Sequence, residues 1–273
     1  MEVVMSELFS VTGKVALVTG GTQGIGRMIA QGFVEAGARV YLTARTKSDC
    51  EDVAQELSAG GGECVAIPAD LSDEQECVRL AREIADRESG LHILVNNAGT
   101  AWTAPVEQFP ASAWDSVLDL GLKAPLFLVR ELAPLLRAAG TAEDPARIVN
   151  IGSADALRVP EMPTYSAAAA KAAIHHITRM LAHDFAPTVT ANVIAPGSFP
   201  SRMMAGVLDA MGEEIAAVTP LQRIGRPDDI VGTAIYLCSR AGSYVTGSVL
   251  AVDGGLATAR TGFVPGRFLT DAQ

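Results

Sequence analysis

Short apolar runs alternate with longer amphipathic segments from one end of the chain to the other. The runs consist almost entirely of apolar residues, as expected of strands that are buried on both faces of a sheet. We expect strands at residues 14–20, 38–44, 64–70, 91–97, 146–152, 189–195 and 248–254. Between them we expect helices near residues 24–37, 49–59, 73–88, 112–139, 163–185 and 226–240.

This alternation predicts the fold class. Strands that alternate with helices form parallel βαβ units with right-handed crossovers. We therefore expect an α/β protein: a single-domain Rossmann-type, doubly wound parallel sheet of about seven strands with helices on both faces. No linker divides residues 1–273. The expected core spans 10–257, with an insertion at 199–219 that precedes the last helix and a C-terminal tail at 258–273.

Composition and charge exclude several function classes. The 273 residues include 21 Lys and Arg against 31 Asp and Glu, and a net charge of -10 disfavours a general nucleic-acid binder. With 49% hydrophobic and 19% charged residues, the chain is expected to fold around a packed core. No apolar run reaches the roughly 18 residues of a transmembrane helix, and the acidic start differs from a secretory signal.

The four cysteines give no sign of a metal site. Their spacing matches no common set of metal ligands, at Cys50, Cys64, Cys77 and Cys238. We expect a reduced, cytoplasmic protein with a small-molecule substrate and with no metal, nucleic-acid or membrane partner.

A glycine-rich turn follows the first expected strand and leads into the first expected helix. Glycines at this point allow a tight turn and let the backbone approach a pyrophosphate at the helix N-terminus, where free N–H groups favour an anion. An ordinary glycine turn is the alternative interpretation, but the place of this turn between strand and helix favours a dinucleotide site. The candidate binding residues here are Gly20, Thr22, Gln23, Gly24, Ile25 and Gly26.

The glycine spacing, together with Asn96-Asn97-Ala98-Gly99, resembles the short-chain dehydrogenase/reductase family. The resemblance covers roughly residues 10–257, and it implies a Rossmann fold, a nicotinamide cofactor and oxidoreductase activity on a carbonyl or an alcohol. Further matches lie in the same order as in the family, at Asp70, Asn192, Pro196-Gly197 and Asp253-Gly254-Gly255.

The end of the second expected strand bears on the choice of cofactor. An acidic residue there would bind the ribose hydroxyls of NAD, whereas a 2′-phosphate needs a cation. Arg45 occupies this place, with Lys47 nearby, and by resemblance it implies NADP(H). A solvated surface arginine is the alternative.

The resemblance assigns further cofactor contacts. Asp70 would bind the adenine, although it could instead cap the helix that follows Ser72. Ser201 lies where the family has a threonine that binds the nicotinamide amide. The remaining contacts implied by the resemblance are Leu71, Asn97, Ala98, Gly99, Lys171, Pro196 and Gly197.

In the resembling family, serine, tyrosine, lysine and asparagine handle the substrate oxygen and its proton. Ser153 and Lys171 match the serine and the lysine. The alternative for Ser153 is a serine that caps a turn. Lys171 lies in an apolar helix where an unpaired ammonium is costly, which favours a functional role.

The other two family positions hold small residues. The family tyrosine precedes its lysine by four residues, which is the position of Ala167, and the asparagine position aligns with Gly121. Tyr165 could substitute as a catalytic residue only if the preceding loop turns it inward; otherwise it packs or lines the pocket wall. Asp155 and Glu161 are other candidate acids, with solvated loop carboxylates as the alternative interpretation.

These departures leave several functions open. We expect an NADP(H)-dependent reductase of an apolar carbonyl compound with an atypical proton-transfer site. The alternatives are a non-redox enzyme of the same fold, such as a cyclase, lyase or isomerase, that uses the enlarged pocket, and a catalytically inactive NADP-binding protein. An engineered Ala167 is also possible, but the separate change at Gly121 favours natural divergence.

Other residues have two interpretations each. The insertion at 199–219 resembles the mobile substrate lid of the family, and the long helices at 112–139 and 163–185 imply a homo-oligomer, a dimer or tetramer, by the same resemblance. His175 and His176 are interpreted as packing or interface residues. An apolar cleft wall, or equally plain core, is expected of Trp102, Trp114, Phe199, Met203, Met204 and Met211.

Overall fold

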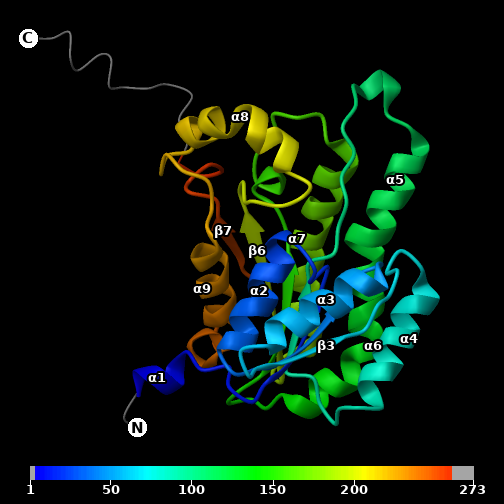
Figure 1. The fold of residues 1–273 in the computed structure, drawn as a ribbon, viewed down its shortest axis with the longest axis vertical. Helices are drawn as coiled ribbons and strands as arrows, with labels where there is room; N and C mark the ends of the chain where they lie inside the picture. The colour runs from blue at the N-terminus through cyan, green and yellow to red at the C-terminus, as the bar shows by residue number, and fades with distance from the viewer. Residues whose placement is uncertain (1–3, 260–273) are drawn as a thin grey trace, which may run out of the picture.

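A seven-stranded parallel sheet forms the centre of the computed structural model, which describes residues 4–259 (Figure 1). The strand order is β3-β2-β1-β4-β5-β6-β7, and every neighbouring pair is parallel. The strands are β1 (Val15–Thr19), β2 (Arg39–Thr43), β3 (Glu63–Ala66), β4 (Ile93–Asn96), β5 (Ala146–Ile151), β6 (Val189–Pro196) and β7 (Val249–Val252). The predicted fold class is confirmed.

Helices cover both faces of this sheet (Figure 1). One apolar cluster joins α4, α6 and α7 to the sheet, and another joins α2 and α9 to the opposite face. No helix in the described part of the chain is long and apolar enough to cross a membrane. The helices are α1 (Met5–Leu8), α2 (Gly24–Glu35), α3 (Lys47–Ser58), α4 (Glu74–Ala85), α5 (Ala111–Leu118), α6 (Ala124–Ala139), α7 (Tyr165–Phe185), α8 (Ala205–Val218) and α9 (Pro227–Cys238), with short 3-10 turns η1 (Val106–Gln108), η3 (Ala154–Ala156) and η4 (Arg240–Gly242).

Burial explains the apolar runs seen in the sequence. Every residue of β1, β4, β5 and β6 is buried, whereas β3 and β7 at the two edges are only partly buried. Strands enclosed between two helical layers must be apolar on both faces, because neither face meets water.

The expected helix at 112–139 is interrupted. It consists of α5, a π-helical turn η2 (Asp119–Lys123) and α6. Pro125, the second residue of α6, has no N–H with which to bond the carbonyl of Gly121 four residues earlier, so the regular hydrogen-bond ladder is lost here. A wider π turn accommodates this break. The insertion at 199–219 contains α8, and all of the expected tail beyond residue 259 lies outside the described residues.

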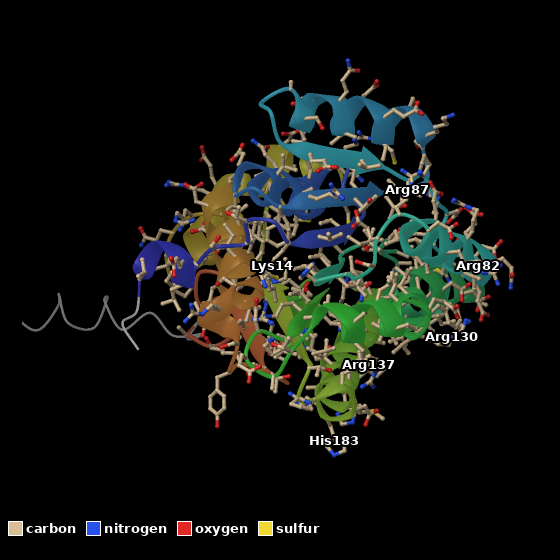
Figure 2. The ribbon with its side chains drawn as sticks, turned by 90° about the horizontal axis from the view of Figure 1, so that it is seen from below. Lys14, Arg82, Arg87, Arg130, Arg137 and His183 are labelled. Atoms are coloured by element: carbon tan, nitrogen blue, oxygen red, sulfur yellow. The ribbon has the colours of Figure 1, made fainter. Side chains whose placement is uncertain are left out.

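The amino ends of the strands form a structural end of the molecule (Figure 2). Lys14, just before β1, pairs with Asp144 at 2.7 Å, and Asp144 also pairs with the buried Arg147 at 2.9 Å. The Arg147 guanidinium donates hydrogen bonds to the carbonyls of Leu237 and Ser239 at 3.1 and 3.0 Å. These bonds attach the C-terminus of α9 to β5, and they leave the opposite end of the sheet for ligands.

Candidate active site

The carboxyl ends of four adjacent strands open onto one cavity. β1, β4, β5 and β6 are neighbours in the sheet, so the loops that follow them meet at one edge. Residues from these loops, from α7 and from α8 line a cavity of about 420 Å³. This edge is where doubly wound sheets bind their ligands.

The glycine turn after β1 is shaped by close backbone contacts. Gly20 and Gly24 have φ angles of +62° and +52°, in the region that favours glycine. A Cβ at Gly20 would lie 2.9 Å from Nδ2 of Asn97, an amide that donates hydrogen bonds to the backbone oxygens of Thr19 and Gly20 at 2.8 and 3.2 Å. At the N-terminus of α2, the N-cap Gln23 makes no side-chain capping bond. The backbone N–H groups at this helix end can therefore bind an anion.

Arg45 lies close to this turn in the loop after β2. The N–H of Gly21 donates to the carbonyl of Thr43 at 3.2 Å, which ties the turn to the end of β2. Arg45 follows two residues later, is exposed, and has no ion-pair partner within residues 4–259. Its guanidinium is therefore available for an anionic ligand beside the glycine turn.

Asp70 organises the turn before α4. Its carboxylate accepts hydrogen bonds from the backbone N–H and the hydroxyl of Ser72 at 3.1 and 2.7 Å. The N-cap of α4 is Asp73, which accepts a hydrogen bond from the N–H of Gln75 at 2.8 Å. The alternative in which Asp70 caps this helix is wrong, because the helix begins one turn later than that interpretation requires.

Ser153 and Lys171 come together on the other side of the cavity. Ser153 follows β5 and starts η3, where its hydroxyl accepts a hydrogen bond from the N–H of Asp155 at 3.1 Å. Lys171 lies on α7, and its ammonium donates a hydrogen bond to the carbonyl of Ile151 at 2.6 Å. Burial lowers the pKa of Lys171 to about 8. Both side chains line the cavity.

His175 lies one helical turn beyond Lys171 and contacts the serine loop. Its Nε2 accepts a long hydrogen bond, 3.4 Å, from the backbone N–H of Ser153. Burial, followed by the charges of Lys171 and Arg179, lowers the pKa of His175 to about 4. The imidazole is therefore neutral near pH 7, as an acceptor must be. This contact was not predicted from the sequence, where the spacing of four residues between Lys171 and His175 is the one local signal.

Three charged side chains stand at the mouth of the cavity. Arg158 contacts Asp155 at 3.2 Å and Glu161 at 3.6 Å. Burial raises the pKa of Asp155, although the charge of Arg158 opposes this shift. All three residues line the cavity. The two carboxylates were predicted from the sequence as candidate acids, whereas the arginine that pairs with them was not predicted.

The wall opposite this charged group is apolar. Met203, Met204 and Phe199 line the cavity as expected, whereas Trp102, Trp114 and Met211 do not. Further apolar side chains come from α8 and from the loop after β7, at Val207, Ile215, Val218 and Leu256.

Comparison with known proteins identifies the family. The family model described as enoyl-(acyl carrier protein) reductase matches residues 20–257. The rhamnolipids biosynthesis 3-oxoacyl-[acyl-carrier-protein] reductase of Pseudomonas aeruginosa is 45% identical over 255 residues, which cover 92% of this chain and 99% of that protein. The short-chain dehydrogenase/reductase PhomF of Diaporthe leptostromiformis is 31% identical over 277 residues, which cover 92% and 94%. The chain belongs to the short-chain dehydrogenase/reductase family of oxidoreductases.

A solved structure agrees with this assignment. The Pseudomonas aeruginosa RhlG/NADP active-site complex matches this structure with a TM-score of 0.89 and 45% sequence identity. The match covers 92% of this chain and 99% of the RhlG chain. The family predicted from the sequence is confirmed.

Two positions of interest for a short-chain dehydrogenase/reductase hold small residues in this structure. Ala167, four residues before Lys171 on α7, lines the cavity. Gly121 is buried in η2. Among the described residues, an added Cβ there would have one neighbouring atom within 4 Å, the Cβ of Ala170 at 3.7 Å. Ala167 thus presents only a methyl group to the cavity, and the surroundings of Gly121 leave room for an added Cβ.

Tyr165 lies away from the cavity. Its ring packs edge-on against Phe109, with ring centroids 5.5 Å apart at 85°, and the residue is 41% exposed. The preceding loop does not turn Tyr165 inward, so the geometry gives no support to a catalytic role for Tyr165.

The predicted cofactor residues fall into three groups. Thr22, Gly26 and Leu71 are buried and do not line the cavity, and Arg45 and Asp70 are exposed in loops. The residues that line the cavity itself are Gly20, Gln23, Gly24, Ile25, Asn97, Ala98, Gly99, Lys171, Pro196, Gly197 and Ser201.

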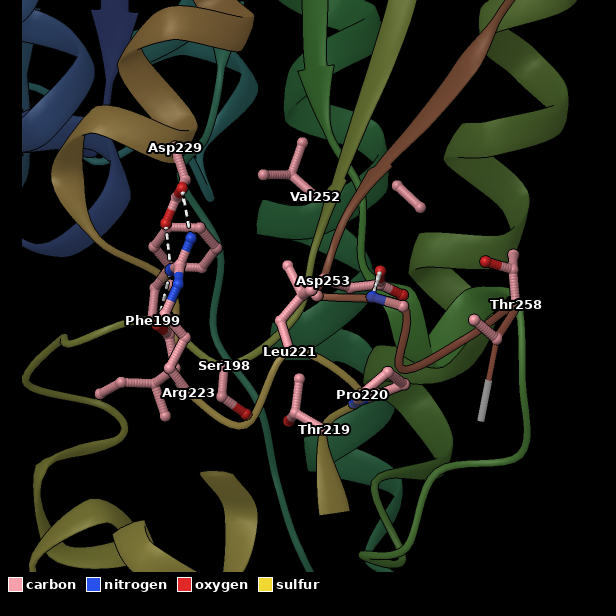
Figure 3. A pocket seen from close by; sticks show the side chains of 16 residues that line it. Ser198, Phe199, Thr219, Pro220, Leu221, Arg223, Asp229, Val252, Asp253 and Thr258 are labelled. Carbon is pink, nitrogen blue, oxygen red and sulfur yellow. Dashed lines mark hydrogen bonds and ion pairs between the residues drawn. The ribbon is translucent and has the colours of Figure 1, made fainter. Parts of the chain in front are cut away.

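A second cavity, of about 480 Å³, lies beyond Phe199 (Figure 3). Its main polar feature is Arg223, whose guanidinium donates two hydrogen bonds to Asp229 at 2.6 and 2.8 Å. These bonds lower the pKa of Asp229 to about 2, so the carboxylate stays ionised near pH 7. Asp229, which lines this second cavity, is therefore not suited to acid-base chemistry near pH 7.

Proposed function

We propose that this short-chain dehydrogenase/reductase binds NADP(H) and reduces the carbonyl group of an apolar small molecule, or oxidises the corresponding alcohol, with an atypical proton-transfer site. One observation carries the proposal: the glycine turn, Ser153 and Lys171 line the same cavity. The similar chain of Pseudomonas aeruginosa RhlG forms a complex with NADP.

The residues around the glycine turn fit a dinucleotide phosphate. The left-handed Gly20 and Gly24 leave room for a pyrophosphate at the N-terminus of α2. The unpaired Arg45 beside the turn suits the 2′-phosphate that distinguishes NADP from NAD. When bound, NADPH supplies the hydride for reduction of the carbonyl carbon.

Ser153 is suited to hold the substrate oxygen. Within residues 4–259 its oxygen accepts the N–H of Asp155 while its hydroxyl hydrogen donates to no other group, so this hydrogen is free to donate to a substrate carbonyl. That donated bond strengthens as negative charge develops on the substrate oxygen, which lowers the barrier to reduction. The backbone contact with His175 holds the serine loop against α7.

The shape of the cavity favours an apolar substrate. Met203, Met204 and Val207 project from the segment around α8, and no residue of α8 is fully buried in the described structure. Apolar side chains that remain partly exposed around a cavity gain stability when an apolar ligand covers them. We therefore assign residues 199–219 to the substrate side, as a lid.

Titration of the protein with NADPH, followed by fluorescence, tests the cofactor half. Arg45→Asp should weaken NADPH binding by about 10-fold or more, because it replaces a charge-assisted phosphate contact with a repulsion. It should not weaken NADH binding and should strengthen it where the new carboxylate accepts hydrogen bonds from the ribose hydroxyls. Arg82→Asp is the matched control: Arg82 is exposed on α4 at the opposite end of the molecule (Figure 2) and should not affect either cofactor. No NADPH binding by the unmodified protein would overturn the proposal.

Gly121 and Ala167 favour a second candidate function. The space at these positions would admit a bulky substrate, as a non-redox enzyme of this fold could require. The same small residues would also be compatible with a protein that binds NADP without turnover. Tight NADPH binding with no consumption of NADPH by any ketone would support this second candidate.

Assembly is a separate proposal. We expect a homo-oligomer in which α6 and α7 pair between subunits; Met180 on α7 is 55% exposed in the single chain. Light scattering would measure the mass in solution, and a monomer at working concentration would contradict the expectation.

A further inference from the structure

The ammonium of Lys171 is held at the point where β4 and β5 end. It donates to the carbonyl of Ile151 at 2.6 Å, and an added Cβ at Gly99, in the loop after β4, would lie 3.8 Å from Nζ. Lys171, Ser153 and Gly99 line the same cavity. A ligand that reaches the Ser153 hydroxyl is therefore in the neighbourhood of the ammonium.

The way from Lys171 to the cavity is open. The residue one helical turn before it on the same face is Ala167, whose methyl group is the smallest side chain that could line the wall there. An ammonium has three hydrogens, and the bond to Ile151 uses one. Within residues 4–259, Lys171 pairs with no carboxylate, so its remaining hydrogens are not committed to a salt bridge.

Other acids near the cavity are less well placed. The ring of Tyr165 packs on Phe109 outside the cavity. The carboxyl of Asp155 is engaged with Arg158 at 3.2 Å. The hydroxyl of Ser153 is a suitable hydrogen-bond donor, but an aliphatic alcohol is too weak an acid to give up its proton by itself.

We infer that Lys171 is the catalytic acid of this enzyme and transfers its own proton to the substrate oxygen, through the space that Ala167 leaves. This inference rests on the proposed reductase function. As the carbonyl carbon accepts the hydride supplied by NADPH, the electron pair of the C=O π bond moves to oxygen. One N–H bond of the ammonium breaks and an O–H bond forms, which leaves a neutral amine and an alcohol. The neutral amine of Lys171 then regains a proton from solvent, which restores the ammonium.

The surroundings of Lys171 suit this role. Burial holds its pKa near 8, close to the working pH of a proton donor, whereas a solvated lysine would hold its proton too tightly. Burial alone lowers the pKa of Lys171, and no nearby charge adds to that shift. The titratable groups of α7 are the neutral His175 and the exposed Tyr165, His176, Arg179, His183 and Asp184. The elements packed against α7 carry Asp155 with Arg158 beside η3, Asp119 paired with Lys123 on η2, the exposed Asp115 on α5, and Arg147 at the amino end of β5.

The acidity of Lys171 can be measured without cofactor or turnover. The chain has four lysines, so competitive labelling with an amine reagent across a pH series, read by mass spectrometry, resolves each one. Lys171 should titrate near pH 8. Lys123 is the control and should titrate at a much higher pH, because its bond to Asp119 raises its pKa. A Lys171 that titrates together with Lys123 would overturn the inference.

Reduction should depend on the charged form of Lys171. Because the ammonium is the donor, kcat/KM for ketone reduction should be high below pH 8 and fall 10-fold per pH unit above it; alcohol oxidation should show the opposite trend. Lys171→Ala should lower kcat by about 10² to 10⁴. Added methylamine should restore part of the loss, since a small ammonium can enter the space and donate the proton.

A matched control and a reversal complete the test. Lys123→Ala, outside the cavity, should keep the activity and the pH profile. Ala167→Tyr should place a phenol within reach of the substrate oxygen and make the activity of Lys171→Ala less dependent on methylamine. Full activity of Lys171→Ala, or a pH profile without a fall near 8, would overturn the inference while leaving the reductase function intact. If the unmodified protein does not bind NADPH, the proposed reductase function itself is overturned.

Discussion

The imidazole of His175 packs so closely against Gly152 that no side chain fits between α7 and the end of β5. A Cβ at Gly152 would overlap both Nε2 and Cδ2 of the ring. The next residue is Ser153, whose N–H bonds to the same Nε2 at 3.4 Å. A glycine and a buried histidine thus set the distance between the helix that carries Lys171 and the loop that carries Ser153.

Gly152→Ala should therefore destabilise the fold and disturb the site. The new methyl group would press on the imidazole and on Cγ1 of Val193, 2.7 Å away, at a cost of about 1 to 3 kcal/mol in the free energy of unfolding. Urea denaturation would measure this cost.

Gly121→Ala is the matched substitution. Its Cβ would meet Ala170 at an ordinary contact distance of 3.7 Å, and replacing a glycine reduces the entropy of the unfolded chain. We expect a stability within about 1 kcal/mol of the unmodified protein or slightly above it. Equal losses in the two variants would show that the fit of Gly152 against His175 is not what matters.

Substitutions of His175 test whether its hydrogen bond positions Ser153 or whether its ring contributes by packing alone. His175→Leu leaves the partly buried Ser153 N–H without this acceptor, which should cost about 1 kcal/mol of stability and lower kcat more than it raises KM. His175→Gln keeps a side-chain oxygen that can accept this bond. Recovery of kcat in the glutamine variant would support the positioning role, and equal activity in both variants would contradict it.

The same histidine should make the fold sensitive to acid. Its pKa is about 4 in the fold and 6.5 in an ordinary setting, so the fold favours the neutral form. The stabilisation is complete above about pH 6.5 and is lost as the pH falls through 6.5 towards 4, by at most about 3 kcal/mol. His175→Gln removes this titration. Unfolding free energies at pH 7.5 and 4.5 should fall less in the variant than in the unmodified protein; an equal fall would contradict the prediction.

A charge on the α8 side should weaken binding of an apolar substrate. Val207→Asp introduces a carboxylate into the apolar wall and should raise KM for an apolar ketone by about 10-fold or more, because burying the carboxylate is unfavourable. Ala210→Asp, on the exposed side of the same helix, is the control and should leave KM unchanged. Binding of NADPH should be the same in both. A low KM in Val207→Asp would mean that α8 does not contact the substrate.

The fold could be predicted from the sequence because local patterns determine it. All seven strands lie inside or within two residues of the expected runs, since strands buried on both faces must be continuously apolar. The dinucleotide-binding end of the molecule could be predicted equally well from the sequence, because the glycine turn and the helix after it are contiguous in the chain. The π turn at Gly121 was not predicted: the apolar pattern continues through it, and only the missing N–H of Pro125 marks the break.

The reaction end was less predictable because its contacts are tertiary. Nothing local indicates that the ring of His175 reaches the N–H of Ser153, which lies on a different element. Nor does the sequence show that Lys171 bonds to the carbonyl of Ile151. The place of Tyr165 depended on whether its loop turns inward, and it packs on Phe109 instead.

The most direct test of the central claim is the consumption of NADPH, followed by absorbance, with a panel of ketones of increasing apolar length. The account predicts ketone-dependent oxidation of NADPH by the unmodified protein. Ser153→Ala should lower kcat by about 10² to 10³, whereas Ser116→Ala, on the exposed surface of α5, should not. Tight binding of NADPH with no oxidation by any ketone across the pH range from 6 to 9 would contradict the claim that this protein is a working reductase.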